Sequence, residues 1–456
     1  MTSPIGSLLL LGASGDLASR LLMPALGQLF DVEPERRSIV LIGAGAEELD
    51  EQAWLDRVRA SFVSAEVSDA TLEAVLATTR YHRADVTRAD DLTRLIAEAP
   101  ETPALYFALP PAVTEKACVA LADVRLPEGT LLVLEKPFGT DQVSAAALNA
   151  QLATLVPETQ IHRVDHFLGR STVLNLLGLR FANRLFELVW DADHIDRVDI
   201  TFDEQLALEN RAGYYDKAGA LTDMIQSHLL QILAIVAMEP ISAVDATELR
   251  EAKATVLRAC RVWDDDPVAA GRRARYTAGS VEGRPVPDYA AEPGVDPGRN
   301  TETLAEVTVE IDTPRWRGVP FLLRSGKALG DLRKEVLVTF RQRHDLPRGL
   351  TGSALPTQLR LSMGPDRMSL EINVNGPDDP LELDRVALDT DLTPGRLPAY
   401  GEVLAGVLNA DPLLAVRGDT AEQCWRIVDP VLQAWRDDQV PLESYAAGSG
   451  GPDGWR

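Results

Sequence analysis

The first 150 residues alternate between short apolar runs that end in turns and longer segments whose apolar positions recur with helical spacing. The predicted strands lie in SLLLLGASGD (7–16), SIVLIGAGAEE (38–48), PALYFALPP (103–111) and TLLVLEKPFG (130–139). The predicted helices lie in ASRLLMPALGQLF (18–30), ATLEAVLATTRYH (70–82), DDLTRLIAEA (90–99) and KACVALADVRL (116–126). This alternation predicts α/β architecture with a doubly wound parallel sheet.

The second half of the chain has a different pattern, with alternating strands rich in β-branched residues. These strands are predicted in RVDITFDE (197–204), AEVTVEI (305–311), KEVLVTF (334–340), QLRLSM (358–363) and MSLEINV (368–374). Helices are predicted at 217–238, 398–408 and 419–436, and the Pro/Gly-rich stretch 279–300 is predicted to be a long ordered loop. We therefore expect an α/β domain at 1–165 and an α+β domain with a large mostly antiparallel sheet at 166–456, the boundary falling near 160–170.

Composition narrows the class of protein. The formal net charge is −24, from 69 acidic and 45 basic residues, which argues against nucleic acid as a partner. The N-terminal apolar run has no basic residues before it, and no run of roughly 18 uncharged apolar residues is found, so neither a signal peptide nor a membrane span is expected. Three widely spaced cysteines indicate neither disulfides nor a metal site, which favours a reducing, cytoplasmic location.

The first candidate site is the turn that joins the first strand to the first helix: Gly12, Ala13, Ser14, Gly15, Asp16 and Leu17. Glycines there let the backbone approach a pyrophosphate, and the helix N-terminus favours negative charge. The spacing GxxGD differs from GxGxxG, so the alternative is an ordinary tight turn with Asp16 as helix cap.

Two further motifs carry positive charge. Glu135-Lys136-Pro137-Phe138-Gly139 ends a predicted buried strand, at the edge where such sheets bind ligands. A simple strand-ending turn is the alternative. Segment 163–170, RVDHFLGR, places two arginines and a histidine within eight residues, a cluster suited to phosphate. A solvated loop is the alternative for this cluster.

A single histidine, His228, lies in the apolar segment DMIQSHLLQILAIVAM (223–238). On an α-helix, Asp223 lies five residues away and would not share its face, whereas Met224 and Gln231 would. His228 is therefore either a buried structural residue or, if a carboxylate such as Asp165 meets it, a general base. Segment 319–329, VPFLLRSGKAL, places Arg324 and Lys327 at the end of an apolar strand, and plain surface charge is the alternative for both.

Taken in order, these motifs resemble the glucose-6-phosphate dehydrogenase family. The matching segments are GASGDLA, YFALPP, EKPFG, RVDHFLGR, LRFANRLF, AGYYDKAGALTDMIQSHLLQ, TETLAEVTVEID, VPFLLRSGKAL, WRIVDPVLQAW and GSGGP, which together span nearly the whole chain. The resemblance implies a Rossmann-like NAD(P)-binding domain and a substrate-binding and dimerisation β+α domain. It implies oxidation of the anomeric carbon of glucose 6-phosphate to 6-phosphogluconolactone, the oxidative entry to the pentose phosphate pathway, by a homodimer or homotetramer.

The resemblance also implies residue roles. His228 would be the general base for the anomeric hydroxyl, and Asp165 would orient it and stabilise its charge. His166, Arg170 and Lys327 would bind the phosphate, while Lys136, Glu204 and Asp223 would contact sugar hydroxyls. Gly12 to Leu17 would bind the coenzyme, Lys136 would lie near the nicotinamide, and Pro137 would form a cis peptide bond in a turn that links the two domains.

The chain departs from the family at positions that bear on the ligands. Relatives that use NADP carry an arginine after the second strand, where this chain has Ala46 followed by Glu47 and Glu48. A nearby carboxylate would repel a 2′-phosphate, so we expect weak discrimination for NADP or a preference for NAD.

Leu21, Phe167 and Ser171 replace a lysine, a tyrosine and an acidic residue that are usual in the family, and Arg170 replaces a lysine. These changes leave open an enzyme for another hexose or amino-sugar phosphate. A non-catalytic NAD(P)-binding homologue also stays open, although a pure binding module has no need of His228.

Overall fold

The computed structural model describes residues 5–209 and 212–455; residues 1–4, on which the expected lack of a signal peptide partly rests, lie outside that range. The chain divides into two compact units. The first contains residues 1–171, 241–254 and 395–423, and the second contains 172–240, 255–394 and 424–456. Each unit has its own sheet.

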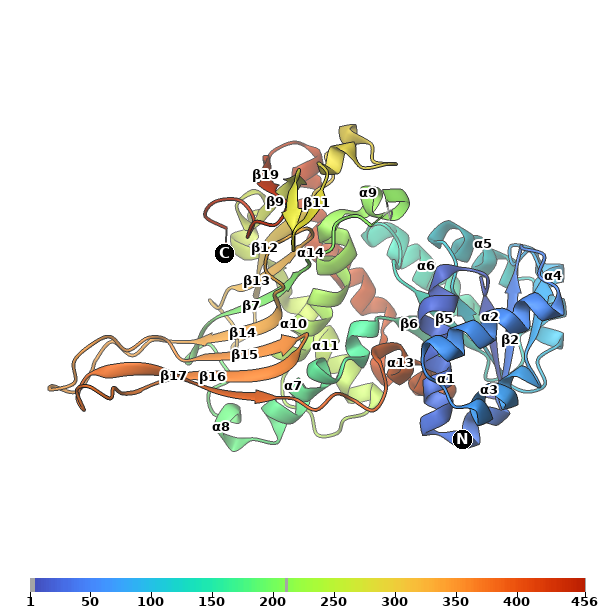
Figure 1. The fold of residues 1–456 in the computed structure, drawn as a ribbon, viewed down its shortest axis with the longest axis horizontal. Coiled ribbons are helices and arrows are strands. Elements are labelled where there is room, and N and C mark those ends of the chain that lie inside the picture. The colour runs from blue at the N-terminus through green and yellow to red at the C-terminus, as the bar shows by residue number, and fades with distance from the viewer. Residues whose placement is uncertain (1–4, 210–211, 456) are drawn as a thin grey trace. The chain divides into compact units, whose positions relative to one another are not determined.

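The first unit contains a seven-stranded sheet of order β18-β6-β5-β4-β1-β2-β3, parallel except for β18. Its strands are β1 Ser7–Leu11, β2 Val40–Gly45, β3 Arg80–Arg83, β4 Pro103–Phe107, β5 Leu131–Glu135, β6 Ile161–Val164 and β18 Ala415–Val416. Its helices are α1 Met23–Val32, α2 Glu51–Ser64, α3 Asp69–Leu76, α4 Ala89–Ala97, α5 Pro111–Leu121, α6 Gln142–Leu155 and α13 Ala399–Leu408 (Figure 1). The predicted doubly wound parallel sheet is confirmed.

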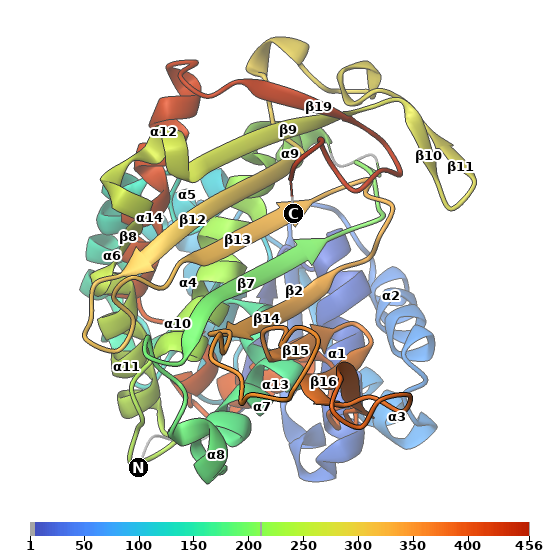
Figure 2. The ribbon, with the colours of Figure 1, turned by 90° about the vertical axis from the view of Figure 1, so that its left-hand side faces the viewer.

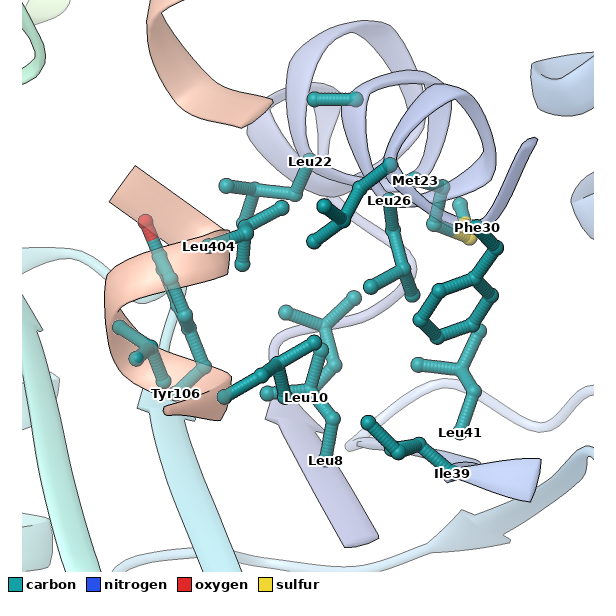
Figure 3. Packing of buried hydrophobic residues seen from close by; sticks show 14 of the residues in the cluster. Leu8, Leu10, Leu22, Met23, Leu26, Phe30, Ile39, Leu41, Tyr106 and Leu404 are labelled. Atoms are coloured by element: carbon teal, nitrogen blue, oxygen red, sulfur yellow. The ribbon is translucent and has the colours of Figure 1, made fainter. Parts of the chain in front are cut away.

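Apolar residues from distant parts of the chain build the core of this unit. Leu8 and Leu10 of β1 point toward Leu26 of α1, and Leu404 of α13 closes the cluster beside Tyr106 of β4 (Figure 3). All five side chains are at most 2% exposed. This packing holds the strand ends, and the turns that follow them, in fixed positions.

The second unit contains a larger sheet of order β17-β16-β15-β14-β7-β13-β12-β9-β19, with β8 paired to β12. Its strands are β7 Ile195–Asp203, β8 Cys260–Val262, β9 Gly271–Thr277, β12 Leu304–Ile311, β13 Phe321–Gly326, β14 Lys334–Phe340, β15 Gln358–Met363, β16 Asp366–Asn375, β17 Leu383–Asp391 and β19 Leu442–Ala446. Most neighbours are antiparallel, while β13–β7 and β19–β9 are parallel, so the predicted mostly antiparallel sheet is confirmed (Figure 2).

The helices of the second unit include α8 Arg184–Glu187, α9 Ala212–Ala220, the π-helix η5 Leu221–Leu229, α10 Leu230–Ala237 and α12 Pro267–Ala270. Three further helices contain residues of both units: α7 Ser171–Phe181, α11 Ala246–Ala259 and α14 Gly418–Arg436. The π-helix packs on β7, β12 and β13. Helix 212–237 is long and apolar enough for a membrane span, but 83% of its apolar window is buried, as in the core helix of a globular protein.

Two local predictions are wrong. The helix predicted at 70–82 ends at Leu76, and Arg80–Arg83 forms the edge strand β3, whose half-exposed polar side chains carry no apolar strand signal. Within 279–300, predicted as a loop, Gly279–Val281 (β10) and Arg284–Val286 (β11) form a short antiparallel hairpin.

Candidate active site

The turn after β1 brings glycine backbone to the carboxyl edge of the parallel sheet. Gly12 has φ +87°, and a Cβ there would lie 2.3 Å from the carbonyl oxygen of Ala108, so only glycine fits. Gly15 and Asp16 are exposed, Ala13 is buried, and Ser14 and Leu17 are half-buried. No side chain caps the π-helical segment Ala18–Leu22, so Asp16 is not the helix cap. Bare backbone at a helix start fits an anionic pyrophosphate.

Charged residues surround the end of the neighbouring strand β2. Ala46, Glu47 and Glu48 follow the strand and are exposed. Glu48 forms an ion pair of 3.1 Å with Arg83 of β3, and Arg57 of α2 donates a hydrogen bond to the Ser14 carbonyl. The two carboxylates stand in the motif after β2, whereas both arginines come from other elements and no local pattern pointed to them.

A half-buried glutamate, Glu135, lies directly before Lys136. The Tyr106 hydroxyl donates to Glu135, and Tyr400 of α13 hydrogen bonds to the same carboxyl. Burial raises the pKa of Glu135 from 4.5 to about 7, although the two tyrosine hydrogen bonds and Lys136 oppose the shift. Lys136 is half-buried, and the peptide bond that joins it to Pro137 is cis, as the resemblance implies. The coenzyme and substrate contacts expected of these residues stay predictions.

The segment after β6 gathers the predicted phosphate ligands around one aromatic ring. Asp165 is 2% exposed and accepts a hydrogen bond of 3.0 Å from the Phe167 N–H, which starts a short 3-10 helix. The Arg170 guanidinium lies 4.5 Å from the centroid of the Phe167 ring, and the His166 ring lies edge-on to it at 4.9 Å. His166 also stacks on Tyr400, with centroids 5.1 Å apart and planes 11° apart. Phe167 thus contacts both side chains without supplying a hydroxyl.

His228 and Asp223 lie on a π-helix rather than an α-helix. Because π-helical hydrogen bonds join residues five apart, positions 223 and 228 lie above one another, and the prediction that they face different ways is wrong. His228 is 1% exposed and Asp223 is 8% exposed. The Tyr214 hydroxyl donates to Asp223 Oδ1 at 3.3 Å. Short π-helical segments of this kind are frequent at functional sites.

Glu204 and Lys327 meet at the end of β7 and β13. The Lys327 Nζ lies 2.7 Å from Glu204 Oε2 and 5.1 Å from the centroid of the Tyr215 ring. The Lys327 carbonyl accepts a hydrogen bond of 2.7 Å from the Tyr445 hydroxyl, which anchors the turn. A cation held between a carboxylate and an aromatic face is suited to a polar anionic ligand.

The predicted residues form two groups, one in each unit. Lys136, Asp165, His166, Arg170 and the glycine turn belong to the first unit, and Glu204, Asp223, His228 and Lys327 belong to the second. The pairing of Asp165 with His228 stays a prediction. Tyr400 was missed because it lies far along the chain from the residues it contacts, whereas Tyr106 and Glu135 already stood in quoted motifs.

A glycine turn at the carboxyl edge of a parallel sheet places the first unit among dinucleotide-binding domains. Residues 9–175 match the family model described as "Glucose-6-phosphate dehydrogenase, NAD binding domain", and residues 177–456 match "Glucose-6-phosphate dehydrogenase, C-terminal domain". The chain belongs to the glucose-6-phosphate dehydrogenase family.

Individual relatives agree with this assignment. The glucose-6-phosphate 1-dehydrogenase of Gluconobacter oxydans is 39% identical, with 97% of this chain and 93% of the relative covered. The crystal structure of the Mycobacterium avium enzyme has a TM-score of 0.86 at 34% identity, covering 99% of this chain and 95% of its own. A glucose-6-phosphate dehydrogenase solved in complex with glucose 6-phosphate has a TM-score of 0.89 at 27% identity, covering 100% and 97%.

Proposed function

We propose that the protein oxidises the anomeric carbon of glucose 6-phosphate to 6-phosphogluconolactone, with hydride transfer to NAD(P)+. The observation that carries the proposal is the buried His228 on a π-helix, on the same side as Asp223, in a chain that keeps Asp165 and Lys136. The non-catalytic alternative gives no reason for such a base. Relatives of at least 35% identity over nearly the full chain are named as this enzyme, which supports the same substrate.

In the proposed mechanism, the protein aligns the sugar and removes one proton. His228, as a neutral imidazole, accepts the proton of the anomeric hydroxyl at Nε2 or Nδ1, and Asp165 holds the ring and stabilises the resulting charge. His166, Arg170 and Lys327 hold the phosphate, which fixes the anomeric carbon at a set distance from the base. The bound nicotinamide supplies the hydride acceptor.

The sugar contacts complete the alignment. Lys136, Glu204 and Asp223 orient hydroxyls by charge-assisted hydrogen bonds, and Lys136 and Pro137 contact the coenzyme. The backbone of residues 12–17 receives the pyrophosphate at the helix start. This division of roles makes the proton transfer, rather than ligand binding, the step that depends on His228.

The first test combines a substrate panel with His228→Asn. Initial rates for several hexose phosphates and amino-sugar phosphates, each with NAD and NADP, should be highest for glucose 6-phosphate. His228→Asn should lower kcat by a factor of about 10² to 10⁴ while the dissociation constants of sugar phosphate and coenzyme stay near those of the wild type. If none of the sugar phosphates is oxidised, the proposed function is wrong. If His228→Asn keeps the wild-type rate, His228 is not the general base.

We infer that the coenzyme specificity is relaxed or favours NAD. The support is the sequence Ala46-Glu47-Glu48, which has Ala46 where relatives carry an arginine and two exposed carboxylates directly after it. Arg83 pairs with Glu48 and so reduces the repulsion that a 2′-phosphate would meet. This pairing favours relaxed coenzyme specificity over exclusive use of NAD.

Ala46→Arg tests this inference directly. It should raise kcat/KM for NADP by about tenfold and change kcat/KM for NAD little, because only NADP carries the 2′-phosphate. A wild-type preference for NADP of about a hundredfold, or about 2.7 kcal/mol, would contradict the inference.

We further propose a cytoplasmic homodimer or homotetramer. The widely spaced cysteines support this location, and the resemblance to the family supports the assembly. Light scattering on a protomer of 49.6 kDa distinguishes the two assemblies from a monomer.

A further inference from the structure

The helix that carries Asp223 and His228 begins directly after a kink in the backbone. Gly219 has φ +68° and ψ +175°, which is not helical, and the chain then continues as the π-helix from Leu221. Gly219 is buried. The direction in which the later side chains point is therefore set by how this first turn is held.

A single buried carboxyl holds that turn. Glu302, which is 7% exposed, accepts a hydrogen bond of 3.0 Å from the Leu221 N–H through Oε1. Its own carbonyl accepts one of 3.3 Å from the Ala220 N–H. A Cβ added to Gly219 would lie 2.2 Å from Glu302 Oε1, so the carboxyl occupies the space that the glycine leaves open.

Glu302 is itself fixed by its neighbours. The Thr301 hydroxyl donates to the Asp216 carbonyl at 2.6 Å, and the Thr303 N–H donates to the Ala274 carbonyl of β9 at 2.8 Å. The Thr303 carbonyl accepts a hydrogen bond of 2.9 Å from the Lys327 N–H. Segment 301–303 therefore joins the start of the π-helix to the turn that carries Lys327.

We propose that Glu302 is a positioning residue of the reaction: it fixes the start of the π-helix, and thereby the orientation of Asp223 and His228, against the turn that carries Lys327. This inference rests on the proposed function. It assigns Glu302 no contact with substrate or coenzyme.

The electrostatics of the site agree with this role. A carboxylate at the N-terminus of a helix is stabilised by the helix dipole and by the N–H groups that have no helical partner. Burial raises the pKa of Glu302 from 4.5 to about 7, while the backbone donors and Arg273 oppose the shift. Tyr215 and Tyr289 also interact with it: burial is the main cause that raises the pKa of both, and the charge of Glu302 adds to the shift.

Glu302→Ala and Glu302→Gln separate positioning from a general loss of stability. The alanine variant leaves the Leu221 N–H without its acceptor and should lower kcat about tenfold to a hundredfold, by the same factor with NAD and with NADP, because a small misplacement of the base affects the chemical step. The glutamine variant keeps an acceptor oxygen at this position and should restore kcat to within about fivefold of the wild type.

Asp266→Ala is the matched control, since Asp266 caps α12 of the same unit by accepting from the Val268 and Ala269 N–H groups at 3.1 Å each. It should lower the melting temperature and leave kcat unchanged. If Glu302→Ala keeps wild-type kcat, or Asp266→Ala loses as much kcat as Glu302→Ala, the positioning role is wrong. An inactive wild type would instead overturn the proposed function.

Gly219→Ala provides an independent measure of the coupling. Its methyl group would collide with the Glu302 carboxyl in the wild type but not in Glu302→Ala. The fold-loss in kcat caused by Gly219→Ala should therefore be smaller in the Glu302→Ala background than in the wild type. Equal losses in the two backgrounds would contradict the proposed contact.

Discussion

Tyr400 connects two residues that the sequence alone did not bring together. Its hydroxyl hydrogen bonds to the Glu135 carboxyl, and its ring stacks on His166. A histidine ring held between Tyr400 and Phe167 has little freedom to rotate, so its orientation toward a phosphate is set before the ligand binds.

Replacement of Tyr400 tests this orientation. Tyr400→Leu should raise KM for glucose 6-phosphate about threefold to tenfold and change kcat less, because an aromatic stack contributes about 0.5–1.5 kcal/mol. Tyr400→Phe keeps the stack and removes only the hydroxyl, so its KM should stay near that of the wild type. Equal KM values for the leucine and phenylalanine variants would show that the stack does not orient His166.

At the scale of elements, the predictability of each strand followed its burial. The strands β1, β4 and β5 are apolar runs with nearly every side chain buried. Their apolar sequence therefore predicts buried strands directly. The edge strand β3, RYHR, buries none of its four side chains completely, and it follows a helix without a glycine or proline between them. Helix α2 was missed, although Trp54, Val58 and Phe62 recur every four residues and are buried.

The helix that carries His228 shows a limit of periodicity arguments. Sequence spacing assigns faces only once the helix type is known, and nothing in DMIQSHLLQIL distinguishes a π-helix from an α-helix. At the start of this helix the Leu221 N–H donates to Glu302, 81 residues away in the sequence, a contact that local spacing does not report. Local pattern therefore identified the candidate base, while its relation to Asp223 required the structure.

At the scale of the whole molecule, each unit contains a carboxyl group that is neutral in part at physiological pH. Burial raises the pKa of Glu135 in the first unit, and of Glu302 in the second, from 4.5 to about 7. A folded pKa above the unfolded one means that the native state binds the proton more tightly. The stabilisation is therefore complete below about pH 4.5 and is lost as the pH rises through about 7.

This linkage predicts how the free energy of unfolding depends on pH. A pKa raised from 4.5 to about 7 corresponds to about 3 kcal/mol for each carboxyl. The denaturant concentration at the unfolding midpoint should therefore decrease as the pH rises from about 5 to about 8. Glu135→Gln and Glu302→Gln should each flatten the curve, because an amide does not titrate. The exposed Glu115→Gln changes the formal charge of −24 by the same amount and serves as the control for general repulsion. If the curves of Glu135→Gln and Glu302→Gln run parallel to that of Glu115→Gln, then net charge, rather than the two buried protons, sets the pH dependence of stability.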